Sequence, residues 1–243
     1  MESVSLLHQT AYEIMSKHLQ RELEQLNKKL MSLFGDVERM INLAKDALCN
    51  QKTDLVDMII ASDIPVDERE VEIEEDCLKI LALHQCVAAD LRRLTTVLKI
   101  NSDLERIADL ACNIASRARD VHKYPYFPIP DHLPEMVSKA CLMVKMSLDS
   151  FVDSDIELAK DVIKLDQSVD EYHLSVIAEL RDLMKQDSDI VEPALHCFTA
   201  ARQIERIADL AENIAEDMIY YIDGEIVRHR HEKIDQLSGQ EDK

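Results

Sequence analysis

Apolar residues recur every three or four positions along almost the whole chain of 243 residues. One series of this kind is Val87, Leu91, Leu94 and Leu98. This spacing places the apolar side chains on one face of an α-helix and is typical of helices that pack against a core. The pattern predicts six helices, over residues 4–49, 52–83, 86–122, 132–151, 155–185 and 190–222.

Proline and glycine mark where these helices are interrupted. Three prolines fall within residues 125–130 and cannot continue a helix, so they indicate a linker over residues 123–131. Gly35 lies inside the first helix, where we expect a bend. Gly224 is well placed to end the last helix, and the polar residues 225–243 are expected to form a frayed tail.

The sequence contains an internal repeat. Residues 104–115 read LERIADLACNIA and residues 204–215 read IERIADLAENIA, with ten of twelve positions identical. Upstream, residues 63–68 (DIPVDE) match residues 166–171 (DQSVDE). The repeat predicts an elongated all-α protein made of two similar three-helix bundles in tandem. Its parts are a first bundle over residues 1–122, a proline-rich linker over residues 123–131, a second bundle over residues 132–224 and a tail over residues 225–243.

Acidic residues recur in pairs, four positions apart, in both copies. The pairs are Asp63 with Asp67, Glu105 with Asp109, Asp166 with Asp170, and Glu205 with Asp209. Like charges at this spacing share a helix face and repel each other, so helix stability does not favour them. If the helices of one copy pack antiparallel, two pairs converge into a patch of four carboxylates. Oxygen-only ligands favour a hard divalent or trivalent cation, and the amide oxygens of Asn113 and Asn213 lie one turn beyond.

An ordinary solvated helix face explains the same pairs. Acidic residues make up about one fifth of the chain, 48 of 243, so pairs four apart arise often without any function. On a helical wheel, Glu105, Arg106 and Asp109 lie opposite an apolar face. The recurrence of the pairs inside two near-identical blocks favours a functional surface, and both interpretations stay open at this point.

Charge and composition exclude several classes of protein. The chain carries 28 Lys and Arg against 48 Asp and Glu, a formal net charge of −20, whereas a nucleic-acid-binding protein needs a basic face. The longest stretches without a charged side chain, residues 80–89 being one, are about half of a membrane span. No signal peptide is apparent, and the six widely spaced cysteines are typical of buried thiols in a reducing compartment. We therefore expect a cytoplasmic protein.

Sequence motifs for catalysis are missing. The Glu-x-x-His pattern of di-iron carboxylate bundles does not occur, and neither do a P-loop, a glycine-rich dinucleotide fingerprint or a Gly-x-Ser-x-Gly elbow. The histidines are scattered along the chain. We therefore expect that the protein is not an enzyme.

Three blocks resemble the PhoU family, the regulatory proteins of the bacterial phosphate-specific transport system. The blocks are residues 89–94 (ADLRRL), residues 103–109 (DLERIAD) and residues 204–209 (IERIAD). The resemblance covers nearly the whole chain and implies two similar three-helix bundles related by pseudo-twofold symmetry. It also implies a negative regulator of phosphate uptake and of the phosphate-starvation response. Such a regulator links the transporter ATPase subunit to a phosphate-sensing histidine kinase, and many members are homodimers.

The resemblance further implies metal binding by the acidic motifs, with iron, zinc, Mg or Mn as candidate ions that the fold does not require. Carried over by position, the ligands are Asp63, Asp67, Glu105, Asp109, Asp166, Asp170, Glu205 and Asp209. Two departures from the family pattern stand out. Gln85-Cys86 replaces the frequent Gln-Pro, and Pro65 lies between the two aspartates of the first pair, where a proline kinks or ends a helix.

Three functions follow from these observations. The first is a signalling adaptor of phosphate homeostasis that reads the state of its partners and does not bind phosphate itself, because a chain at −20 repels phosphate. The second is a carboxylate-bridged metal-binding enzyme or metal store, and the third is a metal-free helical scaffold. Substitution of the carboxylates separates the scaffold from the other two.

Overall fold

The computed structural model describes residues 2–224 and 226, with side chains from residue 17 onwards. Within this part of the chain the secondary structure is entirely helical, which confirms the all-α prediction. The elements are α1 (Glu2–Cys49), η1 (Thr53–Leu55), α2 (Val56–Ala61), α3 (Asp63–Leu83), α4 (Ala88–Val121), α5 (Leu133–Asp153), α6 (Ile156–Gln186), η2 (Ser188–Ile190) and α7 (Val191–Asp223). The tail predicted over residues 225–243 lies outside the described residues, apart from Ile226.

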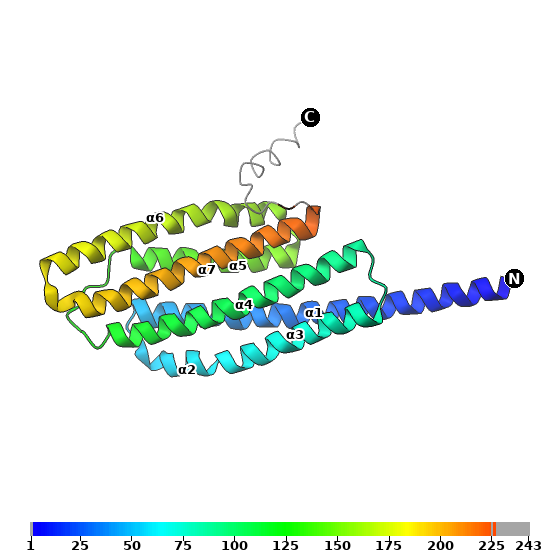
Figure 1. Cartoon of the computed structure of the whole chain (residues 1–243), viewed down its shortest axis with the longest axis horizontal. Coiled ribbons are helices and arrows are strands. Elements are labelled where there is room, and N and C mark those ends of the chain that lie inside the picture. The colour runs from blue at the N-terminus through cyan, green and yellow to red at the C-terminus, as the bar shows by residue number, and fades with distance from the viewer. Residues whose placement is uncertain (1, 225, 227–243) are drawn as a thin grey trace, which may run out of the picture.

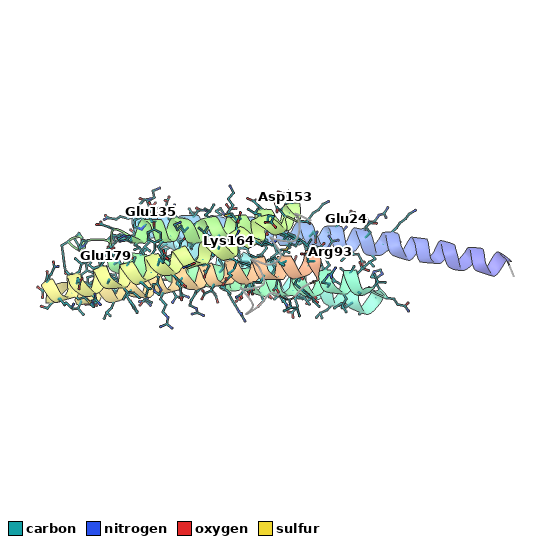
Figure 2. All side chains as sticks on the ribbon, turned by 90° about the horizontal axis from the view of Figure 1, so that it is seen from above. Glu24, Arg93, Glu135, Asp153, Lys164 and Glu179 are labelled. Atoms are coloured by element: carbon teal, nitrogen blue, oxygen red, sulfur yellow. The ribbon has the colours of Figure 1, made fainter. Side chains whose placement is uncertain are left out.

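The long helices form two layers. Figure 1 shows α6, α7, α4 and α3 side by side in one layer, with α5 and α1 behind them. Helices α1, α3 and α4 make up the first bundle and α5, α6 and α7 the second, and α4 packs along α7 where the bundles meet. Seen from above, charged side chains such as Glu135 and Lys164 point outward from the second bundle (Figure 2). At its N-terminal end α1 extends beyond the other helices (Figure 1).

The second predicted helix is divided in two at Ser62. Its hydroxyl donates to the Met58 carbonyl oxygen at 2.8 Å, beside the bond from its own backbone N–H to the same oxygen at 3.0 Å. Helix α3 begins at the next residue, so Pro65 falls in its first turn, where backbone N–H groups have no intrahelical partner. The helix is therefore interrupted before the first acidic pair and not within it. Pro65 therefore does not end the helix between Asp63 and Asp67, since both residues lie on α3.

One continuous hydrophobic core runs through both bundles. The rings of Phe34 on α1 and Phe151 on α5 stack with their centres 6.4 Å apart and connect the back layer across the two bundles. Helix α1 continues through Gly35 without interruption. Gly224 ends α7 in the left-handed conformation, with φ of 77°, as the sequence predicts.

The linker between the bundles is held against α6. Glu179 accepts a hydrogen bond from the backbone N–H of Asp131 at 2.6 Å and pairs with the His132 imidazole. These contacts fix the entry into α5 and the antiparallel course of α5 and α6. None of the described helices contains a stretch that is apolar and long enough to cross a membrane.

Candidate functional site

The first bundle brings two acidic pairs together where α3 packs against α4. Burial raises the pKa of Asp63 above its ordinary value, and the nearby charges of Asp67 and Asp109 raise it further. The pKa of Glu105 is raised by burial first and then by Asp109 and Asp67. One carboxylate oxygen of Asp63 is buried without a hydrogen-bond partner among the described residues. The convergence expected from the sequence is therefore present between α3 and α4.

The second bundle repeats this arrangement between α6 and α7, with stronger electrostatic effects. Burial, followed by the charges of Asp170, Asp209 and Glu205, raises the pKa of Asp166 to about 7. Burial and the charges of Glu205 and Asp170 raise the pKa of Asp209 to about 6, and Arg206 opposes this shift. Each of these carboxyl groups holds a proton more firmly than in water, because burial and neighbours of the same charge both disfavour the ionised form.

The second acidic cluster contains carboxylates beyond the pairs that the sequence predicts. Glu212 joins the second cluster, and burial together with the charges of Asp166, Glu216 and Asp209 raises its pKa to about 8. Glu216 is 6 % exposed. The signal was visible in the sequence, since Glu212 and Glu216 continue the α7 series at intervals of three and four residues and so share its face.

The two clusters differ chemically at one equivalent position. Cys112 in the first repeat corresponds to Glu212 in the second, one hundred residues later. The Cys112 thiol donates to the Ile59 carbonyl oxygen at 3.6 Å, and burial with the charge of Asp63 raises its pKa to about 12. A thiol that stays protonated is a poor metal ligand. Cys112 therefore adds no anionic donor to the first cluster.

The donor chemistry of both clusters fits a hard cation. Carboxylate oxygens are the ligands that Mg, Mn and iron ions accept, and a cation relieves the repulsion that raises these pKa values. As the side chains stand, no three His, Cys, Asp or Glu residues among those described are gathered closely enough to hold one ion. Binding requires the carboxylates to turn toward a shared centre, and their role as ligands stays a prediction.

A polar groove of about 440 Å³ lies between α4 and α7, where the two repeats meet. Equivalent positions of both repeats line it, together with Gln203: Arg106, Asp109, Leu110, Asn113, Arg206, Asp209, Leu210 and Asn213. The groove joins the two acidic clusters into one face, because Asp109 and Asp209 belong both to it and to the clusters. The sequence does not predict the groove, because the groove depends on how α4 packs against α7.

Charged contacts hold the repeat junction at both ends of the groove. At one end, Lys99 of α4 lies 3.1 Å from Asp217 of α7, whose side chain is 2 % exposed. At the other end, Arg117 of α4 lies 3.2 Å from the His196 ring and 3.4 Å from Asp120. The junction therefore joins the two bundles through specific polar contacts as well as through the core.

Comparison with known proteins places these features in a family. A family model described as PhoU domain matches the chain twice, over residues 30–118 and 133–218. A PhoU homolog of Aquifex aeolicus, named a phosphate-specific transport system accessory protein, is 39% identical over 88% of this chain and 96% of the relative. The accessory protein PhoU of Escherichia coli is 33% identical over 86% of either chain.

Solved structures agree with this assignment. The crystal structure of PhoU from Pseudomonas aeruginosa superposes with a TM-score of 0.83 at 33% identity, over 85% of this chain and 99% of that one. The phosphate transport system regulatory protein PhoU of Streptococcus pneumoniae gives a TM-score of 0.79 at 26% identity, over 86% and 99% of the two chains. The predicted pair of similar helical bundles is thereby confirmed.

Proposed function

Because this chain belongs to the PhoU family, we propose that it is an accessory protein of a phosphate-specific transport system. Its role is the negative regulation of phosphate uptake and of the phosphate-starvation response, without catalysis of its own. The observation that carries this proposal is the match to named accessory proteins over 86% to 88% of the chain, in sequence and in both repeats. Because the match covers both repeats, these relatives share the whole fold with this chain and not only one domain.

The proposed partners are the transporter ATPase subunit and a phosphate-sensing histidine kinase, bound by a cytoplasmic homodimer. The test is a pull-down from cells that express the tagged chain at its native level. The ATPase subunit or the kinase should co-purify, in amounts that change with the phosphate supply. Recovery of neither protein at high or low phosphate would contradict the proposal. The same tag on an unrelated acidic helical protein controls for binding through charge alone.

We further propose that the two acidic clusters bind metal ions, with iron, zinc, Mg or Mn as candidates. A bound cation offsets the local negative charge and holds α3 to α4 and α6 to α7, so that the joined face has a fixed shape for partners. The fold does not require the ion, because the core packs independently of the clusters.

Metal content after purification tests this part of the proposal. The wild-type chain should retain metal, and a variant with Asp166→Asn, Asp170→Asn, Glu205→Gln and Asp209→Asn should retain much less. Glu171→Gln, an exposed carboxylate on α6, is the matched control and should leave the metal content unchanged. Equal metal content in all three proteins would contradict metal binding by the cluster. Unchanged partner binding in the quadruple variant would favour the metal-free scaffold.

We propose that the protein senses the phosphate supply through the conformation of its partners and not by binding phosphate itself. The groove at the repeat junction contains Arg106 and Arg206, but Asp109 and Asp209 line it as well, so its arginine charges are balanced. We therefore expect no saturable heat when inorganic phosphate is titrated into the metal-free chain in a calorimeter. Saturable binding at micromolar phosphate would show direct sensing and overturn this part of the proposal.

A further inference from the structure

An apolar stripe runs along the outward face of α3. It consists of Ile64, Val71 and Leu78, which are 63 %, 49 % and 54 % exposed and are spaced seven residues apart. Residues seven apart drift by only about 20° around a helix, so the three side chains form one line. The line lies opposite the buried face of the helix, which includes Ile73 and Ile80. Single exposed apolar residues are ordinary on protein surfaces, whereas three in one line form an apolar ridge against which another helix can pack.

Exposed glutamates flank the α3 stripe on both sides. Glu74 lies on one side of it, and Glu68 and Glu75 lie on the other. Within the described residues none of the three forms a salt bridge, whereas Lys29 is engaged with Glu72 and Asp76. A helix packed along the α3 stripe would meet these carboxylates at its edges, where basic residues of the partner would be favoured. A second copy of this chain packed on the α3 stripe would place glutamate against glutamate.

The second repeat shows that the fold does not need this stripe. Helix α6 is the counterpart of α3, and its equivalent positions, 103 residues later, are Gln167, Leu174 and Arg181. Only Leu174 is apolar there, at 68 % exposure. Because the same helix position in the same fold tolerates Gln and Arg, burial in the bundle does not explain the apolar residues of the α3 stripe.

From these observations we propose that the outward face of α3 is a docking surface for an amphipathic helix of another protein. The partner helix presents apolar residues at heptad spacing to the α3 stripe and Lys or Arg to the flanking glutamates. Apolar contact supplies the binding, and the charges select this partner over a second copy. The surface lies on the first repeat alone, which gives an otherwise pseudo-symmetric molecule a single docking helix.

Fluorescence anisotropy with designed probe peptides tests the proposal directly. The probe is a labelled helical peptide of about three heptads with Leu at the seam and Lys at the flanking positions. A matched peptide carries Glu in place of Lys. At about 0.15 M salt, where exposed charges are partly screened, the Lys peptide should bind the full-length chain and the Glu peptide should not.

Uncharged substitutions separate docking on α3 from general attraction to an acidic protein. The variant Val71→Gln with Leu78→Gln leaves the net charge at −20 and should weaken Lys-peptide binding at least tenfold. Leu174→Gln, the corresponding change on α6, should bind like the wild-type chain. All three side chains are exposed, so the variants should fold, and circular dichroism checks this. Glu74→Gln with Glu75→Gln should reduce both the affinity and its dependence on salt.

Three results would overturn the proposal. Equal binding of the Lys peptide to the wild type and to the Val71→Gln, Leu78→Gln variant would show charge attraction alone. Failure of the wild-type chain to bind the Lys peptide would show that the α3 stripe is not a docking surface for such a helix. Dimers of the wild-type chain that dissociate in this variant, measured by analytical ultracentrifugation, would assign the α3 stripe to a second copy.

Discussion

Replacing Asp166 by Asn tests the electrostatic account of the second cluster, because it removes the charge and keeps the shape. The pKa of Asp166 is raised from 3.8 to about 7 in the folded chain. A carboxyl group with a raised pKa favours folding less as the pH rises, since the folded state holds the proton that the unfolded state has lost. This loss of folding stability begins near the pKa of the carboxyl group in the unfolded chain and is complete above its pKa in the folded chain.

The magnitude follows from the difference between the two pKa values. One pKa unit corresponds to about 1.4 kcal/mol. At pH 8, Asp166→Asn should therefore raise the free energy of unfolding in metal-free buffer, by about 4 kcal/mol at most and by about 2 kcal/mol once solvent screening of this partly exposed group is allowed for. At pH 5 the folded group is mostly protonated already, and the gain falls to about 1 kcal/mol or less. Below pH 4 the gain should vanish.

The assay is urea denaturation at each pH in the presence of a chelator, with Glu171→Gln as the control on the same helix. The control side chain is exposed, and its substitution should change the free energy of unfolding little at any pH. A destabilised Asp166→Asn variant at pH 8, or a gain that does not depend on pH, would refute the reasoning. Saturation with a bound metal ion should reverse the sign, because only the wild-type chain keeps the full ligand set.

Three further substitutions test the fold and the repeat junction, each by urea denaturation. Gly224→Ala should cost about 1 kcal/mol or more, because φ is 77° and the new Cβ meets the Arg92 guanidinium; an unchanged midpoint would contradict this. Leu104→Ala, fully buried on α4, should cost about 2–5 kcal/mol through cavity formation. Lys99→Met should cost about 1–3 kcal/mol, because the buried Asp217 carboxylate loses its lysine; no loss would show that this contact does not stabilise the junction.

Much of the fold is readable from the sequence because its signals are local or repeated. The three- and four-residue spacing predicts the helices, and Gly224 predicts the end of α7, since both depend on residues close together in the chain. The break at Ser62 was missed because an interruption of one residue leaves the spacing of the apolar residues unchanged. Pro65 was noticed, but its place in the first turn of α3 depends on that break.

The acidic clusters were partly readable. The repeated pairs on α6 and α7 predicted that carboxylates converge, because antiparallel packing of neighbouring helices follows from short connections. The size of the pKa shifts was not readable, since burial of Asp166 and Glu212 depends on tertiary packing. The groove between α4 and α7 could not be predicted from the sequence either, because it forms only where the two repeats pack against each other.

The activity of a phosphate-starvation reporter in phosphate-rich medium tests the central claim most directly. If the chain is a negative regulator of phosphate uptake, cells that lack it should express the reporter strongly despite ample phosphate. Expression of the wild-type chain from a plasmid should restore repression in those cells. A reporter that stays repressed when the chain is absent would contradict the account.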